Sequence, residues 1–260
     1  MQKSLKNIKC FLLDMDGTVH LSGKAFPGVR EAIGRMRKQA RVLFVTNSTL
    51  FSRSDQAQKL ANMGIQCDED DIYTSAIATR DYLNQNCQGK KVYVLGTEIL
   101  KGELKAGGIQ VVEDKPDLVV SSFDNTVTFD KLVKTCDFIR AGIPFLATHP
   151  DNNYPILGGY WPDAGAKLAL IKASTGKDPF VICGKPYKPL GDGVMKLANC
   201  KPHEVAMIGD RLMTDVVLAK NNGFVSVLVL TGEATLADHE KSPHKADIIL
   251  ESVAVWDQTS

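Results

Sequence analysis

The sequence predicts an α/β fold in which helices cover both faces of a parallel sheet and a second α/β segment is inserted. Apolar strand segments alternate with amphipathic helix segments along most of the 260 residues. Segments suited to one sheet lie near both ends of the chain, and a further strand and helix series lies between them. The sheet is therefore expected to be assembled from the two ends.

The first part of the chain contains a β–α–β unit. Residues 11–13 form an apolar strand segment, Pro27 is typical of a helix start, and residues 41–45 form a second strand segment. A helix is then expected over residues 54–63, with Gly64 ending it in the left-handed conformation.

The last part of the chain repeats this pattern. Residues 205–208 are predicted as a strand, residues 216–222 as a helix that ends at Gly223, and residues 225–230 as a further strand. These strands are apolar throughout, which is typical of a parallel sheet buried on both faces.

The middle of the chain has enough elements for a domain of its own. We expect a core of residues 1–76 and 184–260, and an inserted α/β domain of residues 77–183. One extended sheet containing all the strands is the alternative. The strands of the middle segment are expected at residues 91–96, 118–120 and 144–147.

Asp14 and Asp16 directly follow the first apolar strand. Residues two apart at a strand end begin on the same face, and ligands bind at the carboxyl ends of parallel strands. Two close carboxylates repel each other, and an oxygen-only pair favours Mg²⁺. The pair therefore predicts phosphoryl chemistry with Mg²⁺. An ordinary turn is the alternative, because Asp and Gly are common turn residues.

Three further strand ends carry polar side chains. Thr46 and Asn47 offer a hydroxyl, an amide and loop N–H groups to an anion, although both residues also cap helices. Lys185 lies between Gly and Pro in a predicted tight turn. Asp210 and Asp215 follow the strand at 205–208, where they add two carboxylates to the predicted metal site.

These motifs together resemble those of the haloacid dehalogenase (HAD) superfamily phosphatases. The resemblance implies a Rossmann-like, HAD-like parallel-sheet core with a large inserted α/β cap domain. The four motifs are Asp14-Met15-Asp16-Gly17-Thr18, Thr46, Lys185, and Gly209-Asp210 with Asp215. Stretches similar to the capped branch, subfamily IIA, with its para-nitrophenyl phosphatases and NagD-type proteins, are 45–48, 147–151, 162–165, 184–186, 209–215 and 229–232.

The resemblance implies roles for the four aspartates. Asp14 is expected to attack phosphorus and form an aspartyl-phosphate, and Asp16 to serve as general acid and then as general base. Mg²⁺ is expected to bind Asp14, the backbone carbonyl of Asp16, and Asp210. Asp215 is expected to orient these ligands or a metal-bound water.

The resemblance also implies a phosphoryl-binding set. Lys185 and Thr46 are expected to hold the phosphoryl oxygens, and Asn47 to help place the transferring group. Ser48 stands where this branch often has a second Asn. Because that position is thought to act mainly through its backbone N–H, the departure changes little.

Residues 77–183 are expected to form a cap that contacts the substrate beyond its phosphate. The predicted specificity loop is 147–155, where His149 is a candidate for substrate contact or for a structural role. Asp163 is expected either to help dock the cap on the core or to cap the helix over residues 166–173.

The expected partner is a small phosphorylated metabolite such as a sugar phosphate or a nucleoside monophosphate. A net charge of +1 indicates neither a nucleic acid polymer nor a membrane surface, and no apolar run is long enough to span a bilayer. The six scattered cysteines are typical of reduced thiols, and together with the lack of a membrane span they favour the cytoplasm. A monomer and a homodimer are both compatible with the sequence.

Other functions remain possible from the sequence. A phosphotransferase or mutase of the same superfamily would differ only in using a hydroxyl acceptor in place of water. A signalling receiver domain also has a phosphorylated Asp with Thr or Ser and Lys at strand ends, but it has neither the D-G-T sequence nor a large insertion. A non-catalytic binding protein would be expected to lack Asp14 or Asp16, and both are present.

Overall fold

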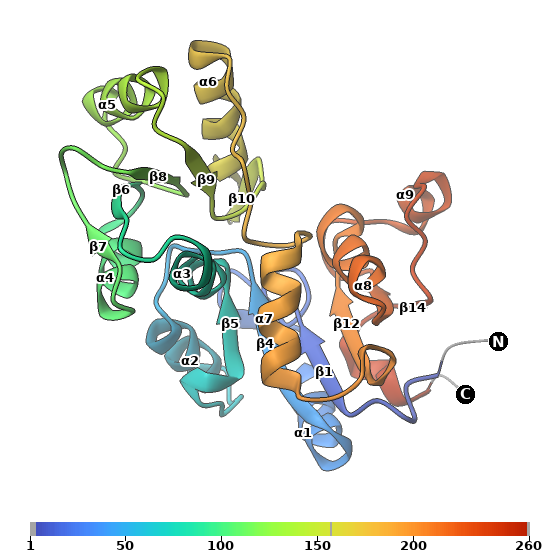
Figure 1. The fold of residues 1–260 in the computed structure, drawn as a ribbon. Helices are drawn as coiled ribbons and strands as arrows, with labels where there is room; N and C mark the ends of the chain where they lie inside the picture. Colours follow the sequence, from blue (N-terminus) through green and yellow to red (C-terminus); the bar gives the residue numbers. More distant parts are fainter. Residues whose placement is uncertain (1–3, 157, 259–260) are drawn as a thin grey trace. The chain divides into compact units, whose positions relative to one another are not determined.

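The computed structural model describes residues 4–156 and 158–258, and these form two compact units. The first unit contains the described residues up to 46, residues 53–73, and those from 185 onward; the second contains residues 47–52 and 74–184. Both units are built from a parallel sheet and helices, which confirms the predicted α/β class (Figure 1). Residues 1–3 and 259–260 of the predicted core segments lie outside the described residues.

The first unit contains a six-stranded sheet in the order β14-β13-β12-β1-β4-β5. Strand β1 lies between β12 and β4 and runs parallel to both. Chain segments from both ends of the sequence are thus neighbours at the centre of the sheet, as predicted. The strands are β1 (Cys10–Leu13), β4 (Arg41–Thr46), β5 (Ile72–Thr74), β12 (Val205–Gly209), β13 (Val225–Val229) and β14 (Ile248–Leu250).

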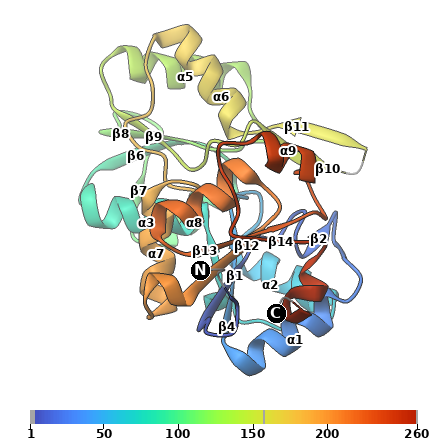
Figure 2. The same cartoon turned by 90° about the vertical axis from the view of Figure 1, so that its right-hand side faces the viewer.

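Helices cover both faces of this sheet (Figure 2). Ile33 of α1, Leu60 of α2 and Trp256 of the C-terminal 3₁₀ segment share one apolar core with Phe11 and Phe44 of the strands. Helices α7 and α8 lie on the opposite face. The elements are α1 (Val29–Gln39), α2 (Arg53–Asn62), α7 (Lys188–Ala198), α8 (Val217–Asn222), α9 (Leu236–Lys241), the 3₁₀ segments Glu69–Asp71, Pro202–Glu204 and Val253–Gln258, and the small hairpin of β2 (His20–Leu21) and β3 (Lys24–Ala25).

Two predicted helix ends are confirmed, and an unpredicted turn precedes one of these helices. Gly64 and Gly223 adopt left-handed φ values of 78° and 73° after α2 and α8. The helix predicted over residues 216–222 is present as α8, which starts at Val217, and an unpredicted π turn over Leu212–Val216 precedes it. The carbonyl of Arg211 accepts the amide N–H groups of both Asp215 and Val216, which widens that turn.

The second unit contains a four-stranded parallel sheet in the order β7-β6-β8-β9. Helices α5 and α6 pack on one face through the cluster that includes Tyr93, Phe145 and Ile171, and α3 and α4 lie on the other (Figure 1). The elements are α3 (Ser75–Asn86), β6 (Lys91–Leu95), α4 (Glu98–Ala106), β7 (Gln110–Val111), β8 (Leu118–Ser121), α5 (Phe129–Arg140), β9 (Phe145–Ala147), the antiparallel hairpin of β10 (Asn153–Ile156) and β11 (Gly159–Pro162), and α6 (Ala164–Thr175).

The predicted specificity loop 147–155 is only partly a loop, because its last residues belong to β10. The helix predicted over residues 166–173 is longer, and starts at Ala164 directly after its cap Asp163. No helix within the described ranges combines the length and apolar character needed to cross a bilayer.

Candidate active site

Three carboxylates meet at the carboxyl end of the sheet in the first unit. Asp14 follows β1, Asp210 follows β12, and Asp215 lies in the π turn that comes next. One oxygen of each carboxylate lies within 4.8 Å of the others, and all three residues are buried. The structure therefore brings together three of the four predicted aspartates, because neighbouring parallel strands end at the same edge.

Lys185 supplies the positive charge of this cluster. Its ammonium donates to the Asp14 carboxylate, to Asp215 Oδ1 at 2.7 Å, and to the carbonyl of Val45 at 3.3 Å. Burial opposes the charge on this fully enclosed ammonium, but the two carboxylates outweigh burial and hold the pKa of Lys185 above its ordinary value. Lys185 is thus fixed in its charged form beside Asp14.

The cluster carries more negative than positive charge. Burial, together with the charges of Asp14 and Asp215, raises the pKa of Asp210 to about 8. Burial also raises the pKa of Asp215 to about 6, although the Lys185 ammonium opposes this. Buried oxygen ligands with unbalanced charge suit a hard divalent cation, so these residues fit Mg²⁺.

Gly17 and its neighbours form a cradle around Asp210. Gly17 has a left-handed φ of 94°, and a Cβ on it would overlap the Asp210 carboxylate. Asp210 accepts from the Thr18 hydroxyl at 3.3 Å and from the Glu233 amide at 2.7 Å. The Thr231 hydroxyl donates to the Gly17 carbonyl at 2.6 Å, which fixes the loop that carries Asp16. Sequence reasoning had assigned no role to Thr231, although it lies in one of the matching stretches.

Asp16 lies apart from the three grouped carboxylates. Its carboxylate is 3.4 Å from His20 Nδ1 and 3.7 Å from Lys59 Nζ. Burial lowers the pKa of His20 even though Asp16 opposes this, so the imidazole is neutral near pH 7. Sequence reasoning missed both neighbours. The four-residue spacing of His20 from Asp16 was a usable signal, but nothing in the sequence indicated Lys59.

The predicted phosphoryl-binding residues are divided between the two units. Thr46 ends β4 in the first unit, whereas Asn47 and Ser48 belong to the second. All three residues are buried. The Asn47 side chain donates to Asp151 Oδ2 at 3.1 Å, and its carbonyl accepts from the Ser75 hydroxyl at 2.6 Å.

His149 lies in the second unit, and its ring is completely buried. Its Nε2 is 2.9 Å from Asp163 Oδ1, and its Nδ1 is 2.8 Å from the Thr148 hydroxyl. That hydroxyl donates to Ser122, so Nδ1 is a donor to it and the ring carries both protons. Burial opposes the charge, but Asp163 outweighs burial and raises the pKa of His149. The structure gives this ring partners within its unit, and a direct contact with substrate stays a prediction.

Asp163 completes this pair from the start of α6. Burial favours its neutral form, but His149 and the Ala164 amide, which donates at 2.6 Å, outweigh burial and lower the pKa of Asp163. Asp163 therefore caps the N-terminus of α6, which is one of its two predicted roles.

Two related family models match most of the chain. Residues 11–110 match the model described as haloacid dehalogenase-like hydrolase. Residues 182–256 match a model described as HAD-hydrolase-like. The two matched segments contain Asp14, Lys185, Asp210 and Asp215.

Relatives of known name and structure cover nearly the whole chain. An acid sugar phosphatase of Staphylococcus aureus is 33% identical over 90% of this chain and 91% of that protein. A crystal structure of 4-nitrophenylphosphatase from Thermotoga maritima aligns with a TM-score of 0.93 and 39% identity over 96% of each chain. NagD from Escherichia coli K-12 aligns with a TM-score of 0.87 and 31% identity, over 95% of this chain and 97% of that one.

A glycerol phosphate phosphatase from Mycobacterium tuberculosis adds information on metals. Its structure in complex with magnesium aligns with a TM-score of 0.90 and 30% identity, over 98% of this chain and 78% of that chain. The same protein is also known in complex with calcium.

The His149–Asp163 pair generates a prediction on stability and pH. The charged pair contributes its full stabilisation at pH values below the ordinary pKa of histidine, and this stabilisation is lost as pH rises through the raised pKa of His149. The lowered pKa of Asp163 keeps its carboxylate ionised across this range. Changing His149→Gln should lower the free energy of unfolding by about 2 kcal/mol near pH 6, and by clearly less near pH 9.

Urea unfolding at both pH values measures this difference. His203→Gln, which changes an exposed histidine, is the control and should show no such dependence on pH. Equal losses at the two pH values for His149→Gln would mean that the ring does not act as a cation.

Proposed function

This chain belongs to the haloacid dehalogenase-like hydrolases, among the NagD-like phosphatases of subfamily IIA, and we propose that it hydrolyses small phosphomonoesters with Mg²⁺ through an aspartyl-phosphate. The buried group of Asp14, Asp210, Asp215 and Lys185 is the observation that carries this proposal. It combines a carboxylate nucleophile, a fixed ammonium, and an oxygen-only site for a cation.

Asp14 is proposed as the nucleophile. Its carboxylate attacks phosphorus, the bond from phosphorus to the ester oxygen breaks, and Asp16 donates a proton to the leaving alcohol. Asp16 then takes a proton from water as the water oxygen attacks phosphorus and restores the Asp14 carboxylate. The Lys59 ammonium, 3.7 Å from the Asp16 carboxylate, supports a place for this carboxylate beside the site, because the opposite charges attract each other.

Mg²⁺ is proposed to bind Asp14, the backbone carbonyl of Asp16, and Asp210. When bound, it offsets the charge of the carboxylates and of the phosphoryl oxygens. Asp215 positions these groups through its contacts with Lys185 and with the Arg211 amide, which it accepts at 3.2 Å. The raised pKa values of Asp210 and Asp215 support this assignment, since burial and the neighbouring carboxylates disfavour their charged forms and a bound cation would offset both effects.

The phosphoryl group is proposed to be held by Lys185, Thr46, Asn47 and Ser48. Lys185 and the Thr46 hydroxyl supply charge and a hydrogen bond to the phosphoryl oxygens, and the other two supply an amide and a backbone N–H. His149 contributes through the packing of the segment that follows Thr46, because Ser75 contacts both the Asn47 carbonyl and the His149 ring.

The second unit is proposed as a cap that selects the substrate, here sugar phosphates or nucleoside monophosphates, with para-nitrophenyl phosphate as a test substrate. The names of the relatives support this range, since they include an acid sugar phosphatase and a 4-nitrophenylphosphatase. We place the enzyme in the cytoplasm, in keeping with its six free cysteines, as a monomer or homodimer.

Asp14→Asn tests the nucleophile. Release of phosphate from para-nitrophenyl phosphate should fall by about 10⁴-fold or more, because an amide oxygen is a poor nucleophile. The circular dichroism spectrum should be unchanged. Asp68→Asn, which alters an exposed aspartate far along the chain, should keep wild-type turnover. Near-normal turnover of Asp14→Asn would remove the proposed mechanism.

Mg²⁺ binding has a readout that is independent of turnover. Saturating Mg²⁺ should raise the thermal unfolding midpoint of the EDTA-treated wild type by roughly 5 °C, because a ligand that binds only the folded state stabilises it. Asp210→Asn should show little of this shift, and Asp192→Asn, on the exposed side of α7, should show all of it. The same shift in all three proteins would place the cation elsewhere.

A further inference from the structure

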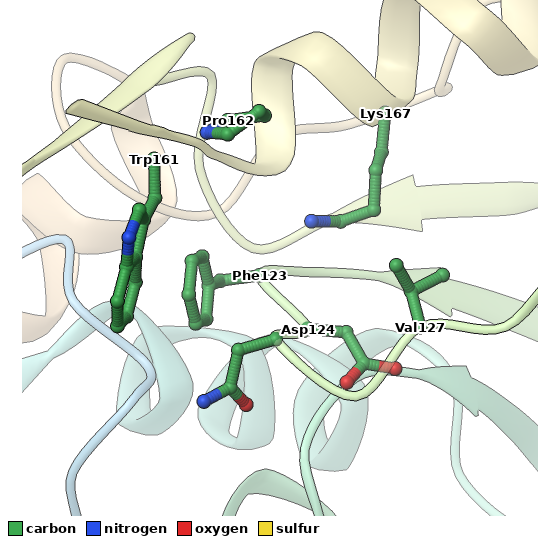
Figure 3. Close-up of a pocket in the computed structure, with 7 residues that line it drawn as sticks. Phe123, Asp124, Val127, Trp161, Pro162 and Lys167 are labelled. Carbon is green, nitrogen blue, oxygen red and sulfur yellow. The ribbon is translucent and has the colours of Figure 1, made fainter.

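The second unit contains a cavity of about 380 Å³ that no residue of the proposed phosphoryl-transfer chemistry lines. It lies between the segment after β8, strand β11 and the first turns of α6 (Figure 3). This volume suits a small organic molecule. The lining residues are Phe123, Asp124, Asn125, Val127, Trp161, Pro162 and Lys167.

Lys167 places a cation in this cavity. The residue is 8% exposed, and Figure 3 shows its ammonium directed into the space above the Phe123 ring, whose centroid is 5.2 Å from Nζ. Among the described residues, Nζ has this ring contact but no ion pair and no hydrogen bond. An ammonium buried without a counterion is unfavourable, so an anion in the cavity would stabilise it.

The two carboxylates that act on the Lys167 ammonium, those of Asp124 and Asp163, each have other partners. Asp124 pairs with Lys131 at 3.0 Å and accepts from the Thr126 amide at 2.8 Å. Asp163 is bound to His149. These two carboxylates act on Lys167 from a distance, but burial is the larger influence and lowers the pKa of its ammonium.

Aromatic rings form the other wall of the cavity. Phe123 contacts Tyr154 with ring centroids 5.7 Å apart, and Tyr154 contacts Trp161 at 6.3 Å. Phe123 is buried, whereas Trp161 is 42% exposed and lies at the edge of the space (Figure 3). Flat apolar groups pack well against such rings.

We propose that this cavity binds a flat organic group that carries a carboxylate or a comparable anion, with Lys167 as its counterion and Phe123 and Trp161 as its walls. This group is the part of the phosphomonoester that leaves as the alcohol, an assignment that rests on the proposed function. Substrates with a second anionic group are thereby favoured over neutral esters of the same shape.

A matched pair of aryl phosphates isolates the charge. The esters 4-carboxyphenyl phosphate and 4-carbamoylphenyl phosphate have nearly the same shape, and they differ in one negative charge. The ratio of their kcat/KM values should favour the carboxylate in the wild type. Lys167→Met should reduce this ratio by about tenfold or more, the loss of one charge-assisted contact, while changing kcat/KM for the carbamoyl ester by less than about threefold.

Lys167→Arg is the conservative control and should retain most of the preference. Lys167→Met keeps an apolar stem of similar length and removes an unpaired buried charge, so it should fold at least as stably as the wild type. A ratio that is unchanged in Lys167→Met, or equal losses for both esters, would overturn the assignment of Lys167.

A binding measurement with the leaving group alone tests the same contact without hydrolysis. The probe is 4-hydroxybenzoate, compared with 4-hydroxybenzamide, followed by quenching of the fluorescence of Trp161 with Trp161→Phe as the blank. The anion should bind at least about tenfold more tightly than the amide in the wild type and equally in Lys167→Met. Charge-dependent binding without hydrolysis of any ester would support the anion-binding role of the cavity and refute the proposed phosphatase activity. Hydrolysis with no charge preference in kinetics or in binding would support the phosphatase activity and refute the anion-binding role.

Discussion

The imbalance of charge at the carboxyl end of the first sheet is the constraint on which the active site depends. Three buried carboxylates share one buried ammonium, so the site is incomplete without further positive charge. Burial, together with the neighbouring carboxylates, raises the pKa of Asp210 and Asp215, and the excess of negative charge favours a divalent cation. A phosphoryl group held beside such a cation would meet the proposed nucleophile Asp14 and a fixed ammonium at once, which is the preorganisation that phosphoryl transfer requires.

The second unit contains two buried cationic side chains with different surroundings. One has partners within the fold, and the other borders a cavity. His149 has a carboxylate partner and a hydroxyl partner inside the unit, so its charge is satisfied by the fold itself. Lys167 has an aromatic ring beside it and an open cavity in front of it. A satisfied charge holds segments of the unit together, whereas an unsatisfied charge next to a cavity is suited to a ligand.

The sequence was sufficient to predict the four central strands of the first sheet, its assembly from both chain ends, and the meeting of Asp14, Asp210 and Asp215, but not the edge strands β5 and β14. These predictions rest on local periodicity and on one rule of parallel sheets, and neither needs tertiary detail. The approach of Lys59 to Asp16 and the cavity around Lys167 depend on side-chain packing between distant segments, which leaves no local pattern. The π turn that carries Asp215 was not predicted, because its residues show no pattern that distinguishes a π turn from other segments between a strand and a helix.

The most direct test of the account is to trap the phosphorylated Asp14. In an Asp16→Asn variant with Mg²⁺ and para-nitrophenyl phosphate, the good leaving group needs little acid assistance, whereas breakdown of the acyl phosphate lacks its base. Quenching with borohydride reduces an aspartyl-phosphate to homoserine, which mass spectrometry of the peptide locates. We expect homoserine at position 14 in the variant given substrate, and none without substrate. Nitrophenol release with an unmodified residue 14 would contradict it.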